Sequence, residues 1–194
     1  NMSFVPVFIP NPPTLNNFIE VFERNDFLTY TINSVIVSFG ATGLALLAFQ
    51  GAGYTPAGDP QHDFTKVTAR AWKTLLRKQG EDGSFFQSGG NNTQLYTQAI
   101  CTIAVCELYG MTQDSRYREP AQRAIDYCVR VQSREGGWRY NPGAGSDLSV
   151  TGWFAMALQS ARMAGLEVPS PTLAGISRYL DSVSSQGGIA YSYQ

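Results

Sequence analysis

Histidine and cysteine are both scarce in this sequence. His62 is the only histidine in 194 residues, and it stands in a connector rich in proline, glycine and aspartate. A catalytic triad built on histidine, or a metal site with several histidines, is therefore hard to assemble within the chain. The three cysteines, Cys101, Cys106 and Cys128, are odd in number and lack the close CxxC spacing of metal and redox sites. The sequence thus indicates no disulfide framework and favours buried free thiols.

Long runs of charge are also missing. The chain carries 14 Lys+Arg against 15 Asp+Glu, which gives a formal net charge of -1. Neither sign clusters enough to attract nucleic acid or an anionic membrane surface, so we expect no nucleic-acid partner. No glycine-rich loop follows a strand pattern, and no cofactor is expected. The 43% hydrophobic content is enough for a sizeable core.

What the sequence does contain is an internal repeat. The loop-like stretch Gln79–Phe85 (QGEDGSF) recurs 53 residues later as Gln132–Trp138 (QSREGGW). A weaker third copy, Gln186–Ile189 (QGGI), follows at about the same interval. A fixed period of this length is typical of stacked supersecondary units.

An amphipathic helix is predicted before each loop copy. Pro120 and Pro171 suit the first turns of the second and third of these helices. The apolar residues of each helix recur every three or four positions. They are Trp72, Leu75 and Leu76; Ala121, Ile125 and Cys128; and Ile176, Tyr179, Leu180 and Val183.

Segments of another kind alternate with these helices. Ala99–Gly110 and Thr151–Gly165 are apolar on nearly every side of a helix over their first halves, and Ala41–Gly53 is a third segment of this kind. Such helices need neighbours all round, which favours an inner row wrapped by the amphipathic outer row. We therefore predict an all-α fold: an incomplete α/α toroid of about three helix pairs over residues 41–194, with an N-terminal apolar helix.

The repeat resembles known proteins. The Gln-x4-Gly-Trp pattern at Gln132–Trp138 resembles the QW motif of squalene and oxidosqualene cyclases, and prenyltransferase β subunits share the two-ring fold. Ala104–Tyr140 together with Asp147–Val168 resembles bacterial prenyltransferase/squalene-oxidase repeat proteins. The resemblance covers about residues 41–194 and implies a cavity for an isoprenoid or lipid.

The motifs that give such relatives their chemistry are altered here. Cyclases that protonate an alkene use D-x-D-D-T, and the nearest match, Asp147-Leu-Ser-Val-Thr151, has serine at the donor position. Asp147 is thus a weak catalytic candidate, and its preferred interpretation is a helix cap. Asp126-Tyr-Cys128 matches the D-x-C of the prenyltransferase zinc site, but no histidine follows it, so no metal site is expected. Bacterial relatives carry His-Gly where this chain has Gln98-Ala99, and whether the chain is an enzyme stays open.

An aromatic and polar set remains near the predicted starts of the inner helices. In cyclases such residues line an apolar cavity, and the alternative is that they pack in the core. The candidate ligand-binding residues are Tyr96, Gln98, Trp138, Tyr140, Asp147, Thr151 and Trp153.

The first forty residues lie outside the repeat and form a separate predicted segment, 1–40. Phe27–Phe49 has 23 residues without a charge, which is long enough to cross a bilayer. Residues 4–49 resemble a permease segment of sugar ABC transporters, and this resemblance meets the repeat near Gly40. The segment is either a native membrane anchor, which would make the chain membrane-associated, or foreign sequence joined to a soluble domain.

Three functions follow from these patterns. The first is a domain that binds an isoprenoid or lipid, and the second is a non-catalytic interaction scaffold. The third, a transporter fragment, depends on the N-terminal segment alone. We interpret the chain as a fragment whose incomplete arc leaves an apolar edge, through which copies could self-associate.

Overall fold

The protein is all-α, as the sequence predicts. The computed structural model describes residues 27–86, 94–185, 188 and 190–192, and for residues 27–37 it describes the backbone alone. These residues form six helices and one short antiparallel hairpin. The elements are α2 (Phe27–Gly51), α3 (Asp63–Arg77), α4 (Gln94–Thr112), α5 (Ser115–Arg130), α6 (Leu148–Met163), α7 (Ser170–Val183), β1 (Ser184–Ser185) and β2 (Ala190–Tyr191).

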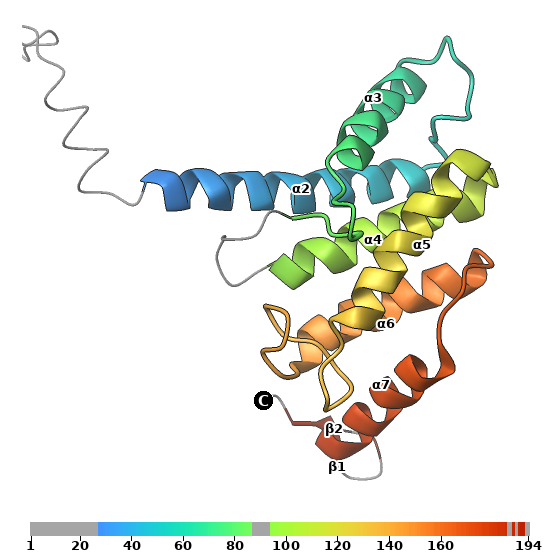
Figure 1. Ribbon diagram of the computed structural model, residues 1–194. Helices are drawn as coiled ribbons and strands as arrows, with labels where there is room; N and C mark the ends of the chain where they lie inside the picture. Colours follow the sequence, from blue (N-terminus) through green and yellow to red (C-terminus); the bar gives the residue numbers. More distant parts are fainter. Residues whose placement is uncertain (1–26, 87–93, 186–187, 189, 193–194) are drawn as a thin grey trace, which may run out of the picture.

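The helices pack as stacked pairs in two rows. The inner row is α2, α4 and α6, which lie side by side, and α3, α5 and α7 form the outer row (Figure 1). The middle inner helix, α4, packs against α2, α5 and α6 and is buried on almost every side. This position explains its all-round apolar sequence, since every face meets a neighbour.

The outer helices bury one stripe each. Trp72 and Leu75 are buried in α3, and Ile125 and Cys128 are buried in α5. In α7 the buried stripe includes Ile176, Tyr179 and Val183. The predicted amphipathic pattern is therefore confirmed.

The repeated loops fasten each outer helix to the next one. In both copies the glutamine at the end of an outer helix donates from Nε2 to two backbone carbonyls, one in its own loop and one near the start of the following outer helix. The bonds run from Gln79 to Gly83 O (3.4 Å) and Pro120 O (2.9 Å), and from Gln132 to Gly136 O (2.7 Å) and Thr172 O (3.0 Å).

Glycine is required in these loops for two reasons. Gly83 and Gly136 have φ values of 89° and 103°, in the region that side chains disfavour. A Cβ on either would lie 2.0 Å from a backbone oxygen of the next outer helix, Arg123 or Gly175. In the third copy Gly188 also has a positive φ, 88°, and Gln186 lies outside the described residues.

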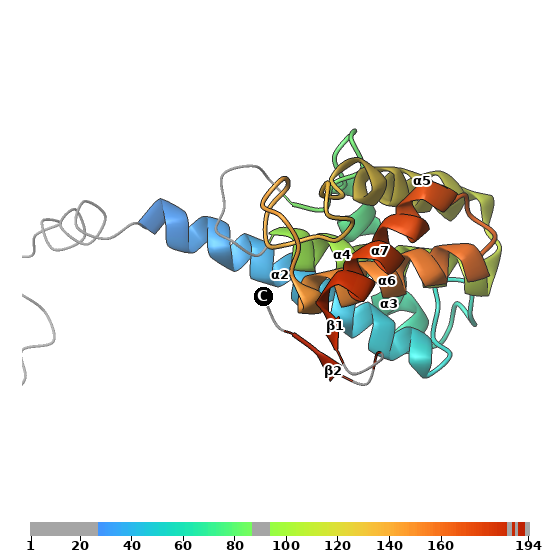
Figure 2. The same cartoon turned by 90° about the horizontal axis from the view of Figure 1, so that it is seen from below.

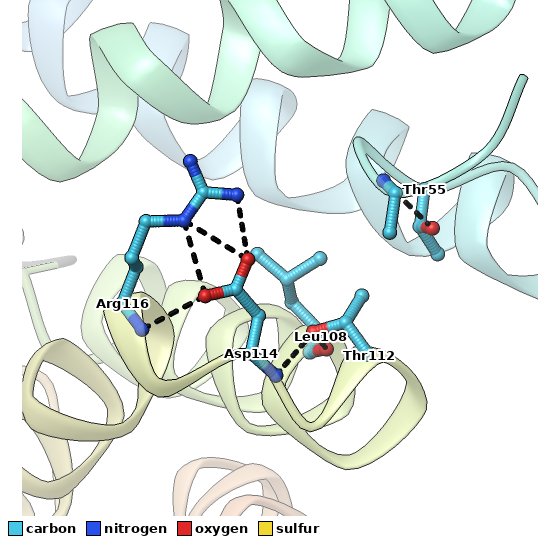
Figure 3. A network of polar contacts seen from close by, with 6 residues as sticks. Thr55, Leu108, Thr112, Asp114 and Arg116 are labelled. Atoms are coloured by element: carbon cyan, nitrogen blue, oxygen red, sulfur yellow. Dashed lines mark hydrogen bonds and ion pairs between the residues drawn. The ribbon is translucent and has the colours of Figure 1, made fainter. Parts of the chain in front are cut away.

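The start of α5 differs from the sequence-based expectation. Asp114 caps this helix by accepting a hydrogen bond from Arg116 N at 2.9 Å, and its carboxylate also pairs with the Arg116 guanidinium (Figure 3). Helix α5 therefore begins at Ser115, and Pro120 lies inside it and not in the first turn as predicted. The prediction for Pro171 is confirmed, because α7 starts at Ser170.

Helix α2 runs without a break through Gly40, the boundary expected between the two segments. Gly40, Gly43 and Leu46 form a stripe that is buried against α4, and a Cβ on Gly43 would lie 3.0 Å from a methyl of Ile100. The first half of α2 projects past the other helices (Figure 2).

The structure gives no support to the membrane-spanning segment expected at Phe27–Phe49. Within the described part of the chain, no helix combines enough length with enough apolar character to cross a membrane. The permease-like sequence before residue 27 lies outside the described residues.

Candidate functional site

A chain of polar side chains joins the N-terminal ends of α4 and α6. Asp147 caps α6 by accepting from Val150 N at 3.0 Å, which confirms the preferred interpretation of this residue. Its Oδ1 also accepts from the Ser149 hydroxyl at 2.6 Å. Since Ser149 gives its proton to Asp147, the Tyr96 hydroxyl, 2.5 Å from Ser149 Oγ, is the donor to Ser149. Tyr140 lies beside these hydrogen-bonded side chains, with its ring centroid 6.0 Å from that of Tyr96.

Three further predicted site residues are completely buried in the core. They are Gln98, Trp138 and Thr151. Gln98 Oε1 accepts from Phe85 N at 2.7 Å, and Thr151 Oγ1 accepts from Trp138 N at 3.0 Å. Gln98 and Thr151 are 53 residues apart, so both perform the same task in successive repeats: each secures the aromatic residue of a loop.

Trp138 is held on two sides within the core. Its ring stacks on Phe154 at a centroid distance of 4.6 Å and an interplanar angle of 7°. Its indole Nε1 donates to Cys128 O at 2.9 Å. These contacts occupy the ring face and the polar atom that a ligand would use, and they favour core packing for this residue.

An apolar hollow lies elsewhere, on the face shared by the three inner helices. This inner groove has a volume of about 490 Å³, is open to solvent, and is lined mainly by apolar atoms. One predicted site residue, Trp153, takes part. The lining residues are Leu47 of α2, Ile103 and Glu107 of α4, and Trp153, Ala155, Met156, Gln159 and Ser160 of α6.

Tyr96 and Ser149 lie on the same faces of α4 and α6 as the residues of the inner groove. On α4, Tyr96 precedes Ile103 by about two turns, and on α6, Ser149 precedes Trp153 by about one turn. The inner groove thus starts about one turn beyond the tyrosine–serine pair. At its far side the Ser160 hydroxyl donates to Glu107 Oε1 at 2.6 Å.

A smaller cavity of about 190 Å³ adjoins the inner groove and shares Glu107 and Ser160 with it. Cys106 also lines this cavity, but burial raises the pKa of its thiol and keeps it protonated. A protonated, buried thiol is a poor nucleophile.

The D-x-C pair, Asp126 and Cys128, is split between two environments. Cys128 is fully buried and its sulfur lies 3.6 Å from Thr102 Oγ1, whereas Asp126 is exposed. Burial raises the pKa of the Cys128 thiol to about 12. In the described residues, no group of three or more His, Cys, Asp or Glu side chains could hold a metal ion.

Most residues of the inner groove were not predicted as site residues. The missed signal is three polar residues in the later turns of the largely apolar inner helices: Glu107 on α4, and Gln159 and Ser160 on α6. Glu107 and Ser160 are also 53 residues apart, so they occupy the same position in successive repeats and meet across the inner row.

The fold and this surface define an all-α protein of stacked helix pairs with an apolar groove on its inner row. No family model, curated protein or solved structure matches the chain.

Proposed function

We propose that this chain is an arc of an α/α-toroid-type domain that binds the apolar chain of an isoprenoid or lipid in its inner groove. The observation that carries the proposal is the groove itself, which is lined by residues from α2, α4 and α6 together. Its volume of about 490 Å³ falls within the range of small-molecule sites, about 300 to 1,000 Å³.

The lining suits an apolar ligand. Leu47, Ile103 and Met156 offer flexible or branched aliphatic contacts, and Trp153 adds an aromatic face. Removing such surface from water on binding is favourable by about 25 cal/mol per Å². The polar residues of the lining, Glu107, Gln159 and Ser160, would orient the ligand.

The polar residues support a proposal in which the domain binds its ligand without catalysing a reaction. The residue at the place of the cyclase acid is Ser149, whose hydroxyl cannot protonate an alkene. Asp147, the remaining carboxylate of that motif, is 1% exposed and bonded to its own helix. These groups fix the start of α6 and leave the groove as the interacting surface.

The first test measures binding of a neutral apolar fluorophore, N-phenyl-1-naphthylamine, and its displacement by farnesol. The variant Met156→Glu places a charge in the groove, and Leu44→Glu is its matched control. Both side chains are 48% exposed on inner helices, but Leu44 does not line the groove. We expect Met156→Glu to weaken binding at least about tenfold, or about 1.4 kcal/mol, and Leu44→Glu to leave the affinity within about twofold. Equal affinity in the two variants, or no binding by the parent chain, would contradict the proposal.

A second candidate function is a protein-interaction scaffold. Exposed apolar residues on α2 and α3, the first helix pair of the stack, favour it. Leu44, Phe64 and Val67 are all exposed there. An edge of this kind fits another repeat unit or a second copy of the chain. This candidate predicts that Leu44→Glu, and not Met156→Glu, abolishes self-association measured by sedimentation velocity.

A further inference from the structure

One carboxylate stands among the apolar residues of the inner groove. Of the side chains that line the groove, Glu107 alone carries a charge, and it lines the adjoining smaller cavity as well. Ser160 donates to its Oε1 at 2.6 Å, which fixes the direction of the carboxylate. Within the part of the chain that the structure describes, the second oxygen of Glu107 has no hydrogen-bond partner. That oxygen is available to a donor on a ligand.

The helix ends beside Glu107 add to the negative character of this place. The smaller cavity reaches the last turns of α4 and α6, where it touches Gly110, Met111 and Met163. The C-terminal end of a helix carries partial negative charge from its aligned peptide dipoles and favours cations. Two independent features, the carboxylate and the helix ends, thus both favour a positively charged group at this place.

No cationic side chain lines either cavity. Arg162 is in the last turn of α6 but lines neither of the two hollows. An anionic head group bound here would meet Glu107 with no compensating charge, and like charges at close range repel. Sites that hold phosphates show the opposite arrangement, with Arg, Lys or helix N-termini.

We propose that the ligand of the inner groove is an amphiphile whose polar end is a hydrogen-bond donor, a hydroxyl or a protonated amine held by Glu107, and not a carboxylate, phosphate or diphosphate. This proposal rests on the proposed function, because it assigns the head group of the same ligand. The apolar chain would lie over Ile103, Trp153 and Met156, and the head would bind the second oxygen of Glu107, beside the Glu107–Ser160 hydrogen bond.

The test uses four competitors with the same twelve-carbon chain: dodecylamine, dodecanol, dodecanoate and dodecyl phosphate, each below its micelle concentration. Each displaces N-phenyl-1-naphthylamine from the full chain at neutral pH. We expect dodecylamine to bind at least about tenfold more tightly than dodecanoate, with dodecanol between them and dodecyl phosphate weakest. In Glu107→Gln the ratio of amine to carboxylate affinity should fall below about threefold. Glu81→Gln, which removes an exposed carboxylate outside the groove, should keep the parent ratio.

The outcomes separate the two proposals. If the fluorophore and all four competitors fail to bind, the proposed function is wrong. If they bind but dodecanoate or dodecyl phosphate is as tight as the amine, the head-group proposal is overturned and the groove remains. An unchanged ratio in Glu107→Gln, or a ratio lost equally in Glu81→Gln, would also overturn it.

Discussion

At the scale of single residues, hydrogen bonds that join repeat loops to inner helices explain several polar positions in the core. Gln98 and Thr151 occupy equivalent positions one repeat apart, and each holds a loop backbone amide. The side chains differ in size, yet both place an oxygen acceptor within reach of the amide. Buried polar groups of this kind are costly to leave unpaired.

The variant Thr151→Val tests this role. It keeps the side-chain shape but removes the acceptor for Trp138 N, and we expect the free energy of unfolding in urea to fall by about 2 kcal/mol. Thr74→Val is the control, because the Thr74 hydroxyl is exposed and bonds within its own helix to Arg70 O. The control should change stability by less than about 0.5 kcal/mol. A loss for Thr151→Val no larger than that of Thr74→Val would show that the loop is secured by other contacts.

At the scale of elements, the repeated loop is the part that sets the spacing of the outer row. Gln132 donates to Thr172 O near the start of α7, and the Gly136 backbone lies against Gly175 in the second turn of the same helix. The same contacts recur one repeat earlier at Gln79 and Gly83. Each loop therefore defines where the following outer helix can lie.

Substitution of the loop glycine separates conformational strain from this close approach. Gly136→Ala introduces both a side chain at positive φ and a Cβ 2.0 Å from Gly175 O, so we expect a loss of about 3 kcal/mol or more and faster proteolysis of α7. Gly143→Ala is the matched control, since Gly143 also has positive φ, 76°, but open space around a Cβ. It should cost about 1 kcal/mol. Similar losses for the two variants would mean that α7 moves aside freely.

At the scale of the whole molecule, the three thiols report on the integrity of the packed core. Cys101 and Cys106 lie in α4, Cys128 lies in α5, and all three are buried and free. Burial raises the pKa of Cys101 and of Cys128 to about 12, and it raises the pKa of Cys106 as well. The thiols can ionise at moderately alkaline pH only when the chain unfolds.

The sign of the resulting pH dependence follows from proton binding. Between the ordinary thiol pKa of 9.0 and about 12, the unfolded chain binds fewer protons than the folded one, so stability falls as pH rises. Each thiol should cost about 1.4 kcal/mol by pH 10, measured as the urea midpoint from pH 7 to 10.5. A Cys128→Ala variant should have a shallower decline by about one third. An identical decline in parent and variant would assign the effect to other groups.

Much of the fold could be read from the sequence because it rests on local patterns. The stripes around Trp72, Ile125 and Ile176 identified the outer helices, and the cap at Asp147 was recognised from its side chain and position. Pro120 was misplaced because the strong cap at Asp114 starts α5 earlier than the proline suggests. Local chemistry fixes where helices occur more firmly than where they begin.

Less of the candidate site could be predicted from the sequence. Trp153 was identified and lines the groove, but Trp138 and Thr151 are buried in the core, and Glu107 and Met156 were missed. The inner helices are apolar on nearly every side, so their sequences do not distinguish the face that packs from the face that stays open. The sequence by itself determined the helical class, the repeat and the cap at Asp147, because these depend on residues near one another in the chain. Only the tertiary structure decided which faces of α2, α4 and α6 meet around the groove, because that depends on how the rows stack.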